Sequence, residues 1–129
     1  MDERINQSET RQCKVIYPGD LNNHNTLFGG KAMQWMDEVA YITATRYTRT
    51  KMVTFSTEKI KFLKPVPCNT IIELIGKIEK ADCIKLIIRV DVFAEEMYGE
   101  RREKAIEGIF VLVAVSEDDK LKRIDRERK

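Results

Sequence analysis

The stretch Asn23–Tyr41, NHNTLFGGKAMQWMDEVAY, joins a polar loop to a segment with the apolar spacing of a buried helix. The helix begins with two glycines, Gly29 and Gly30, and carries an acidic pair, Asp37 and Glu38, between apolar residues. Glycine is a poor helix former, and a carboxylate is costly to bury without a partner. Because one element combines both penalties, we expect a functional site along it.

The segments around this helix, which we expect to extend from Gly29 to about Tyr47, have the patterns of strands. Short links among the later segments favour antiparallel pairing in a meander-like succession, since parallel strands need long crossovers. One helix cannot cover both faces of the resulting sheet, so we expect an α+β fold with a curved sheet around it. The expected strands cover residues 10–17, 52–63, 69–79, 83–93 and 105–115, the last of them apolar on both faces and therefore in need of a further cover.

The composition is that of a single globular domain. The chain has 129 residues, of which 43% are hydrophobic and 34% are charged. We expect one domain over residues 1–129, with a core at about 10–117 and polar termini. No apolar run reaches the roughly 20 residues of a membrane span. The N-terminus lacks the apolar core of a signal peptide, which favours a cytoplasmic protein.

Neither a disulfide framework nor a metal site is predicted, because no two cysteines form a CxxC pair and the single histidine lies far from them. Two segments, 97–104 and 120–129, are locally basic. Such clusters bind anions or nucleic acid in some proteins, and in others they are a solvated loop and a tail. The three cysteines are Cys13, Cys68 and Cys83, and the single histidine is His24. We expect Cys83 to pack in a strand.

Four short motifs occur in a fixed order. They are PGDLNNHNTLFGG at Pro18–Gly30, WMDEVA at Trp35–Ala40, FLKPV at Phe62–Val66 and GER at Gly99–Arg101. On these motifs, the chain from about residue 15 to residue 115 resembles the YciA-like and cytosolic branch of acyl-CoA thioesterases. This resemblance implies the hotdog fold, a curved antiparallel sheet of five to six strands wrapped around one long central helix.

The resemblance also implies an activity, the hydrolysis of acyl-CoA to a free fatty acid and CoA. It implies no metal and no cofactor other than the CoA of the substrate, and it implies a homohexamer built as a trimer of dimers. Thr26 departs from the family pattern, because some relatives carry Asn or Asp at this position. If that position helps to place the water, this chain uses a hydroxyl or the neighbouring Asn25.

Thioester hydrolysis requires a water, a base that takes its proton, and donors for the oxyanion. Gly29 and Gly30 are expected to offer amide donors at the helix N-terminus, because no Cβ blocks the approach of a ligand. Asp37 follows Gly30 by almost two turns, roughly 10 Å along the axis. That separation is too long for one site on one helix. We therefore expect two antiparallel helices of a dimer to share two sites, with Gly30 of one facing Asp37 of the other.

Asp37 is the expected general base, and the family pattern also aligns its catalytic carboxylate with this residue. Its helix face is shared with Gly30, Met33, Ala40 and Ala44, which we interpret as a small apolar groove for a ligand. Glu38 lies about 100° around the helix and is the alternative base. The other candidates are Asn25 and Thr26 as residues that orient water or thioester, Asn22, His24, Ser56 and Thr57 as substrate contacts, and Lys64 and Arg101 as cations for the CoA phosphates.

Three other functions are considered. An enoyl-CoA hydratase of the hotdog type uses an Asp and a His from one loop, and Asp20 to His24 is superficially similar, but it lacks the proline of that motif. A non-catalytic acyl-CoA-binding protein would not need Asp37. A nucleic-acid binder would need aromatic residues interleaved with the basic ones.

Overall fold

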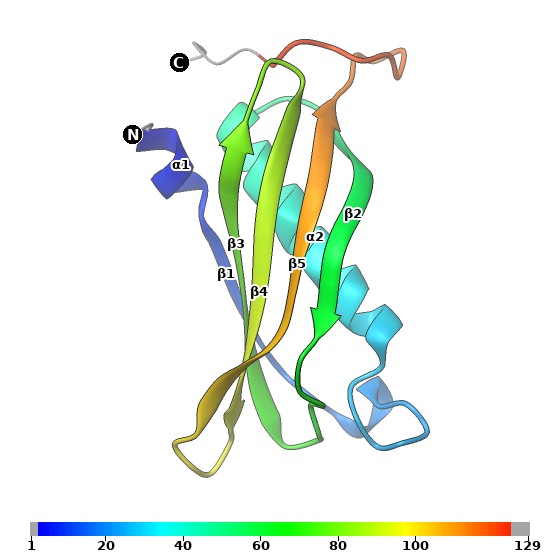
Figure 1. The fold of residues 1–129 in the computed structure, drawn as a ribbon, viewed down its shortest axis with the longest axis vertical. Helices are drawn as coiled ribbons and strands as arrows, with labels where there is room; N and C mark the ends of the chain where they lie inside the picture. Colours follow the sequence, from blue (N-terminus) through cyan, green and yellow to red (C-terminus); the bar gives the residue numbers. More distant parts are fainter. Residues whose placement is uncertain (1–2, 125–129) are drawn as a thin grey trace.

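Five strands form one antiparallel sheet in the order β1-β3-β4-β5-β2 (Figure 1). The computed structural model describes residues 3–124. The strands are β1 (Thr10–Val15), β2 (Met52–Phe62), β3 (Thr70–Ala81), β4 (Lys85–Glu96) and β5 (Arg102–Ala114). The helices are α1 (Glu3–Ser8) and α2 (Gly29–Thr48), with a short 3₁₀ turn, η1 (Pro18–Asp20), between β1 and α2.

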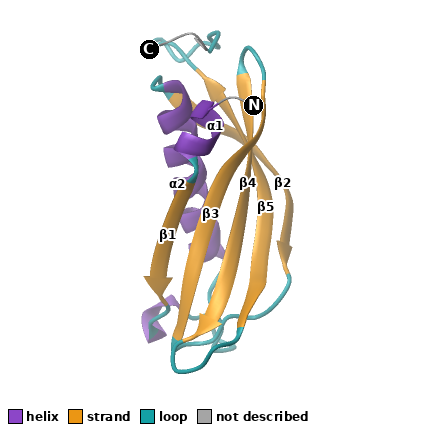
Figure 2. Cartoon of the chain, turned by 90° about the vertical axis from the view of Figure 1, so that its left-hand side faces the viewer, coloured by secondary structure: helices purple, strands orange, loops and turns teal. Residues whose placement is uncertain are grey.

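Helix α2 lies against one face of the curved sheet, and none of the helices within residues 3–124 covers the opposite face (Figure 2). Its buried side chains recur at helical spacing, from Ala32 and Met36 to Val39, Thr43 and Tyr47. Below it, β3 and β4 contribute alternate buried residues, among them Leu74 and Val90. The resulting core lies between α2 and the concave face of the sheet.

Gly76 of β3 allows α2 to approach the sheet closely. A Cβ at this position would lie 2.7 Å from Oγ1 of Thr43 and 2.7 Å from Cγ1 of Val39. The Thr43 hydroxyl donates a hydrogen bond to the carbonyl of Val39, 2.9 Å away, so the polar atom is satisfied within the helix. This close approach at Gly76 fixes the distance at which α2 packs against the sheet.

The predicted helix is confirmed, and it ends where Arg49 adopts a left-handed conformation with φ of 51°. The predicted strands are also present, but the meander is wrong for one of them. β2 pairs with β5 and not with β3, because Pro65 and Pro67 in the link between them cannot take part in a hairpin ladder. Only β3, β4 and β5 pair in chain order.

Three further expectations are corrected. Cys83 is exposed in the turn before β4 and does not pack in a strand, because Asp82 accepts the amides of Ile84 and Lys85 and holds a turn there. β1 ends at Val15, two residues before the expected end at residue 17, and η1 follows from Pro18. The outer face of β5 does not need a partner at Val111 and Val113, which are each 6% exposed within the single chain.

The segment after β5 folds back along the end of the sheet. Lys122 donates its amide to the carbonyl of Ala114, and Ile124 donates to that of Cys83. The basic segment 120–129 lies only partly within the described residues, which end at 124. None of the helices within residues 3–124 has the length and apolar character needed to cross a membrane.

Candidate active site

The loop between η1 and α2 is organised by the side chain of Asn22. Its Oδ1 accepts the amides of His24 and Thr26, at 2.8 and 3.2 Å, and its Nδ2 donates to the hydroxyl of Thr26 at 3.1 Å. Asn25 has a φ of 63°, a conformation that asparagine tolerates better than most residues. Asn22 is therefore occupied in shaping the loop, and it places Thr26 beside it.

Two backbone hydrogen bonds attach this loop to the rest of the molecule. Leu27 donates its amide to the carbonyl of Val66 at 2.7 Å, and Phe28 donates to the carbonyl of Asp20 at 2.9 Å. The Asp20 carboxylate accepts the amide of Tyr17 at 2.9 Å and lies 3.3 Å from Nζ of Lys31. The Tyr17 amide, followed by the Lys31 ammonium, lowers the pKa of Asp20 below its ordinary value.

Helix α2 begins without a side-chain cap. Phe28 occupies the N-cap position with extended backbone, and its carbonyl accepts the amides of Lys31 and Ala32. Gly29 and Gly30 are the first two helical residues, so no preceding turn of the helix can accept their amides. These two N–H groups are the donors that the sequence predicted for an oxyanion.

The space beside each glycine is bordered by an aromatic ring. A Cβ at Gly30 would lie 2.8 Å from Cε2 of Phe28, and a Cβ at Gly29 would lie 3.5 Å from Cζ of Phe62. The absence of a Cβ at Gly30 therefore makes room for the ring of Phe28 as well as for the expected ligand. A Cβ at Gly29 would be in ordinary van der Waals contact with Phe62.

A cleft of about 400 Å³ opens beside the start of α2. It brings together four of the predicted site residues, Asn22, Thr26, Gly29 and Lys64, which come from three segments of the chain. Lys64 comes from the link between β2 and β3. The hydrogen bond from the Leu27 amide to the Val66 carbonyl holds this link against the start of the helix. The remaining lining is formed by Leu27, Phe62, Pro65, Val66 and Ile106.

Asp37 lies on α2 outside this cleft, half-buried and next to the edge strand β2. The hydroxyl of Thr54 donates a hydrogen bond to Oδ1 of Asp37, 2.6 Å away. This distance is typical of a charge-assisted bond between a hydroxyl and a carboxylate. One oxygen of the carboxylate is therefore held by β2, and the other is left for a further donor.

Thr54 is the site residue that the sequence did not predict. Ser56 and Thr57, two and three positions later, were predicted as substrate contacts, and neither bonds to Asp37. A β-bulge separates Thr54 from Ser56 in the register with β5, and a bulge changes which side chains share a face. The alternation along β2 therefore gives no sequence signal for Thr54.

The predicted groove along the Asp37 face is wrong for its two alanines. Ala40 and Ala44 have no exposed surface and belong to the core. Glu38 is exposed. Asp37 thus marks the border between the buried face of α2 and its exposed face.

The other predicted residues do not line the cleft. His24 and Asn25 are exposed on the outside of the loop. Arg101 is exposed in the turn between β4 and β5, where its amide donates to Glu96. Its neighbour Arg102 is paired with Glu73 and Glu95, at 2.8 and 2.7 Å. Within residues 3–124, no group of three or more His, Cys, Asp or Glu side chains could hold a metal ion.

An open antiparallel sheet around one central helix, with a glycine-led helix start, defines a hotdog protein. The family model of the thioesterase superfamily matches residues 24–100, which is more than half of the chain. This protein belongs to the thioesterase superfamily, as the sequence motifs predicted.

Relatives with similar sequences are acyl-CoA thioester hydrolases. The chain is 34% identical to the uncharacterized acyl-CoA thioester hydrolase YkhA of Bacillus subtilis, over 87% of this chain and 70% of the relative. It is 30% identical to the acyl-CoA thioester hydrolase YciA of Salmonella typhimurium, over 88% of each chain. Among solved structures it is similar to an apo-hexameric acyl-CoA thioesterase, with a TM-score of 0.90, 28% identity, and coverage of 93% of this chain and 77% of the other.

Proposed function

We propose that this protein is an acyl-CoA thioesterase, which hydrolyses acyl-CoA to a free fatty acid and CoA. The observation that carries the proposal is the Thr54–Asp37 hydrogen bond, on a helix whose first amides are those of Gly29 and Gly30. A base and a pair of oxyanion donors are the groups that thioester hydrolysis requires. The family and its named hydrolases support the same reaction.

In the proposed reaction, Asp37 takes a proton from a water molecule as the water oxygen attacks the thioester carbonyl. Thr54 holds Oδ1 of the carboxylate, so Oδ2 is the atom that accepts the proton. The amides of Gly29 and Gly30 donate to the oxyanion that forms on the carbonyl oxygen, a type of contact typically worth roughly 3–4 kcal/mol of barrier. The C–S bond then breaks, and the proton returns from Asp37 to the leaving thiolate of CoA.

The active site is proposed to lie between two copies of the chain. Gly30 and Asp37 are separated by roughly 10 Å along one helix, and the cleft at the glycines does not include Asp37. A second, antiparallel α2 would bring the Asp37 of one subunit to the glycines of the other. A hexamer built as a trimer of such dimers is the further proposal, supported by the hexameric structural relative.

CoA is proposed to enter by the cleft at Gly29. Lys64, which lines it, would meet a phosphate, with Arg101 as a second cation. Asn22 and Thr26 would contact or orient the thioester from the loop, with Asn25, His24, Ser56 and Thr57 as the remaining predicted contacts. No cofactor besides the CoA of the substrate is proposed, and a cytoplasmic location stays a prediction.

The test is the release of free CoA thiol from a short, a medium and a long acyl-CoA by the purified protein. We expect hydrolysis with a ranking among the three chain lengths. Binding of CoA without hydrolysis of any of them would make the protein a non-catalytic acyl-CoA-binding protein. Loss of the double bond of an enoyl-CoA with the thioester intact would make it a hydratase.

A further inference from the structure

The two rings at the glycine pair are surface side chains. Phe28 is 55% exposed and Phe62 is 54% exposed, so burial in the core does not hold either ring in its place. Phe28 nevertheless lies close enough to Gly30 that a Cβ there would be 2.8 Å from Cε2 of the ring. The ring therefore occupies the space directly beside Gly30, where a Cβ would lie.

The backbone of Phe28 is fixed on both sides. Its amide donates to the carbonyl of Asp20 at 2.9 Å, and its own carbonyl accepts the amides of Lys31 and Ala32 at 3.0 and 3.1 Å. The ring can change its position only by rotating about its side-chain bonds.

The two rings differ in their relation to the cleft. Phe62 and Gly29 line the cleft that contains Lys64, whereas Phe28 and Gly30 are not among its lining residues. Under the proposed function, the cleft with its cation receives CoA. The acyl group is then placed outside that cleft, beside Gly30 and the ring of Phe28.

We propose that Phe28 determines acyl specificity by excluding branches on the carbon next to the thioester carbonyl. This inference rests on the proposed function. A carbonyl oxygen that accepts the Gly30 amide comes within about 3 Å of the nitrogen, and the adjoining acyl carbon is then beside the ring. A methyl branch on that carbon competes with the ring for the same space. A difference of one methyl group at such a contact is typically worth about 10-fold or more in discrimination.

The experiment compares two pairs of isomeric substrates, n-butyryl-CoA with isobutyryl-CoA, and n-valeryl-CoA with isovaleryl-CoA. The first pair differs at the carbon next to the carbonyl, and the second differs one carbon further away. In Phe28→Ala we expect the isobutyryl to n-butyryl ratio of kcat/KM to rise about 10-fold or more, and the isovaleryl to n-valeryl ratio to change little. Phe28→Leu should give an intermediate rise, and it serves as the second variant if the alanine variant does not fold.

Phe62→Ala is the matched control, since it removes an equally exposed ring from the other glycine. It is expected to change KM for all four substrates but not their ratios. If wild type hydrolyses n-butyryl-CoA and the ratio stays constant in Phe28→Ala, or rises equally in Phe62→Ala, the inference is overturned and the proposed function stands. If wild type hydrolyses none of the four but releases CoA from a longer acyl-CoA, the inference is overturned and the proposed function stands. If it hydrolyses no acyl-CoA of any length, the proposed function fails and the inference fails with it.

Discussion

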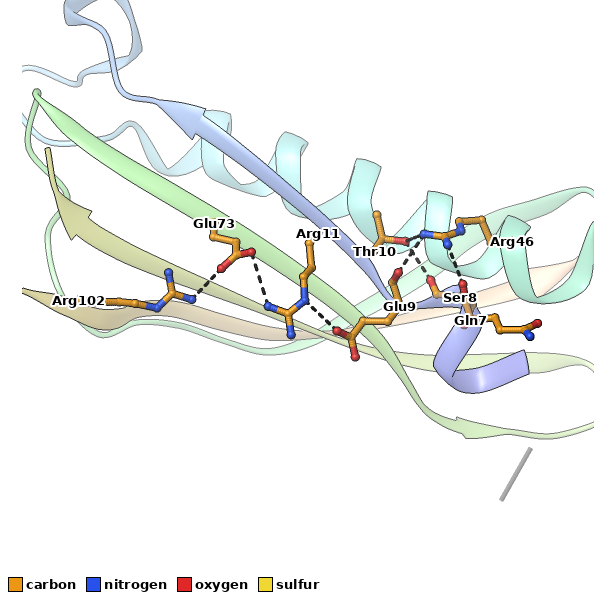
Figure 3. Close-up of polar contacts among 8 residues, drawn as sticks. All are labelled: Gln7, Ser8, Glu9, Thr10, Arg11, Arg46, Glu73 and Arg102. Carbon is orange, nitrogen blue, oxygen red and sulfur yellow. Dashed lines mark hydrogen bonds and ion pairs between the residues drawn. The ribbon is translucent and has the colours of Figure 1, made fainter. Parts of the chain in front are cut away.

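The two edge strands of the sheet differ in how their surroundings hold them. At the β1 edge, Arg46 of α2 donates to the carbonyls of Gln7 and Glu9, at 2.6 and 2.9 Å, and to the hydroxyl of Thr10 at 3.3 Å (Figure 3). These bonds attach the end of α1 and the start of β1 to the central helix. An alternating row of charges then continues across the outer face, through Glu9, Arg11, Glu73, Arg102 and Glu95.

The β2 edge has no comparable attachment among the described residues. Most of the strand is exposed, and it contains two irregularities in its register with β5, one of them beside Lys59, which has a φ of 53°. Phe55 is 71% exposed. A hydrogen bond from Thr54 to Asp37 joins β2 to α2.

The comparison indicates that the β1 edge contributes mainly to stability and the β2 edge mainly to activity. The β1 edge is completed by contacts within the chain, so substitutions there should change stability and leave the activity of the folded protein alone. The β2 edge is open and carries the hydroxyl that holds the predicted base. Substitutions there should change activity more than stability, and each prediction below tests one side of this difference.

The largest effect is expected for Asp37→Asn. The amide cannot take a proton from water, so kcat should fall about 100-fold or more, while the unfolding free energy changes little because Asp37 is only half-buried. Thiol release from acyl-CoA and urea unfolding measure the two quantities. Glu38→Gln is the matched control and should retain wild-type activity. Loss of activity in Glu38→Gln together with retention in Asp37→Asn would move the base to Glu38.

On the other edge, Arg46→Ala should lower the unfolding free energy by about 2 kcal/mol. The substitution removes a charged donor from two backbone carbonyls, and hydrogen bonds to charged groups contribute more than neutral ones. Arg11→Ala is the matched control, because its pairs with Glu9 and Glu73 lie at the surface and should contribute little to stability. Chemical denaturation measures both. Equal losses in the two variants would contradict the special role of Arg46.

Thr54→Val should lower kcat about 10-fold, which corresponds to the loss of one hydrogen bond to a charged group. Thr54→Ser keeps the hydroxyl and should retain most of the activity. A second threonine provides the control. The hydroxyl of Thr45 is buried and has no hydrogen-bond partner among the described residues, so Thr45→Val should keep activity and leave stability unchanged or raised. A decrease of kcat in Thr45→Val would show that the effect at position 54 is not specific.

The local features of the fold were predictable from sequence, and the features that depend on distant contacts were not. The 3.6-residue spacing of α2 and the alternation in β3 and β4 were sufficient to predict those elements. Helix α1 is too short to be stable alone, and its support from Arg46 crosses a large separation in sequence. The pairing of β2 with β5 likewise joins strands that are not consecutive in the sequence, so local patterns do not predict it.

The candidate site shows the same limit. Asp37, the glycine pair and the Asn22 loop stand out because their residue types are unusual for their places in the chain. Thr54 does not, because an exposed threonine is ordinary in a strand and only the bulge after it sets its position against α2. The ring of Phe28 over Gly30 also depends on a side-chain rotamer, which no spacing in the sequence encodes.

The smallest effect is expected at Asp20, where the end of the β1 segment meets the start of α2. The Tyr17 amide lowers the pKa of this carboxyl below its ordinary value of 3.8. A lowered pKa in the folded state contributes stability above the unfolded pKa, and this contribution is lost as the pH falls through the folded pKa. Asp20→Asn should therefore lower the unfolding free energy at neutral pH, and its stability should converge with that of wild type when acid takes the pH below the folded pKa of Asp20.

Asp119→Asn is the matched control, because the Asp119 side chain is 76% exposed and pairs with Lys51 at the surface. Its difference from wild type should be small at both pH values, since exposed ion pairs are screened. Urea unfolding at the two pH values measures all three proteins. A constant deficit of Asp20→Asn at both pH values would mean that the shape of the side chain, and not its charge, holds η1 to the first turn of α2. Acid would then not loosen that junction through this carboxylate.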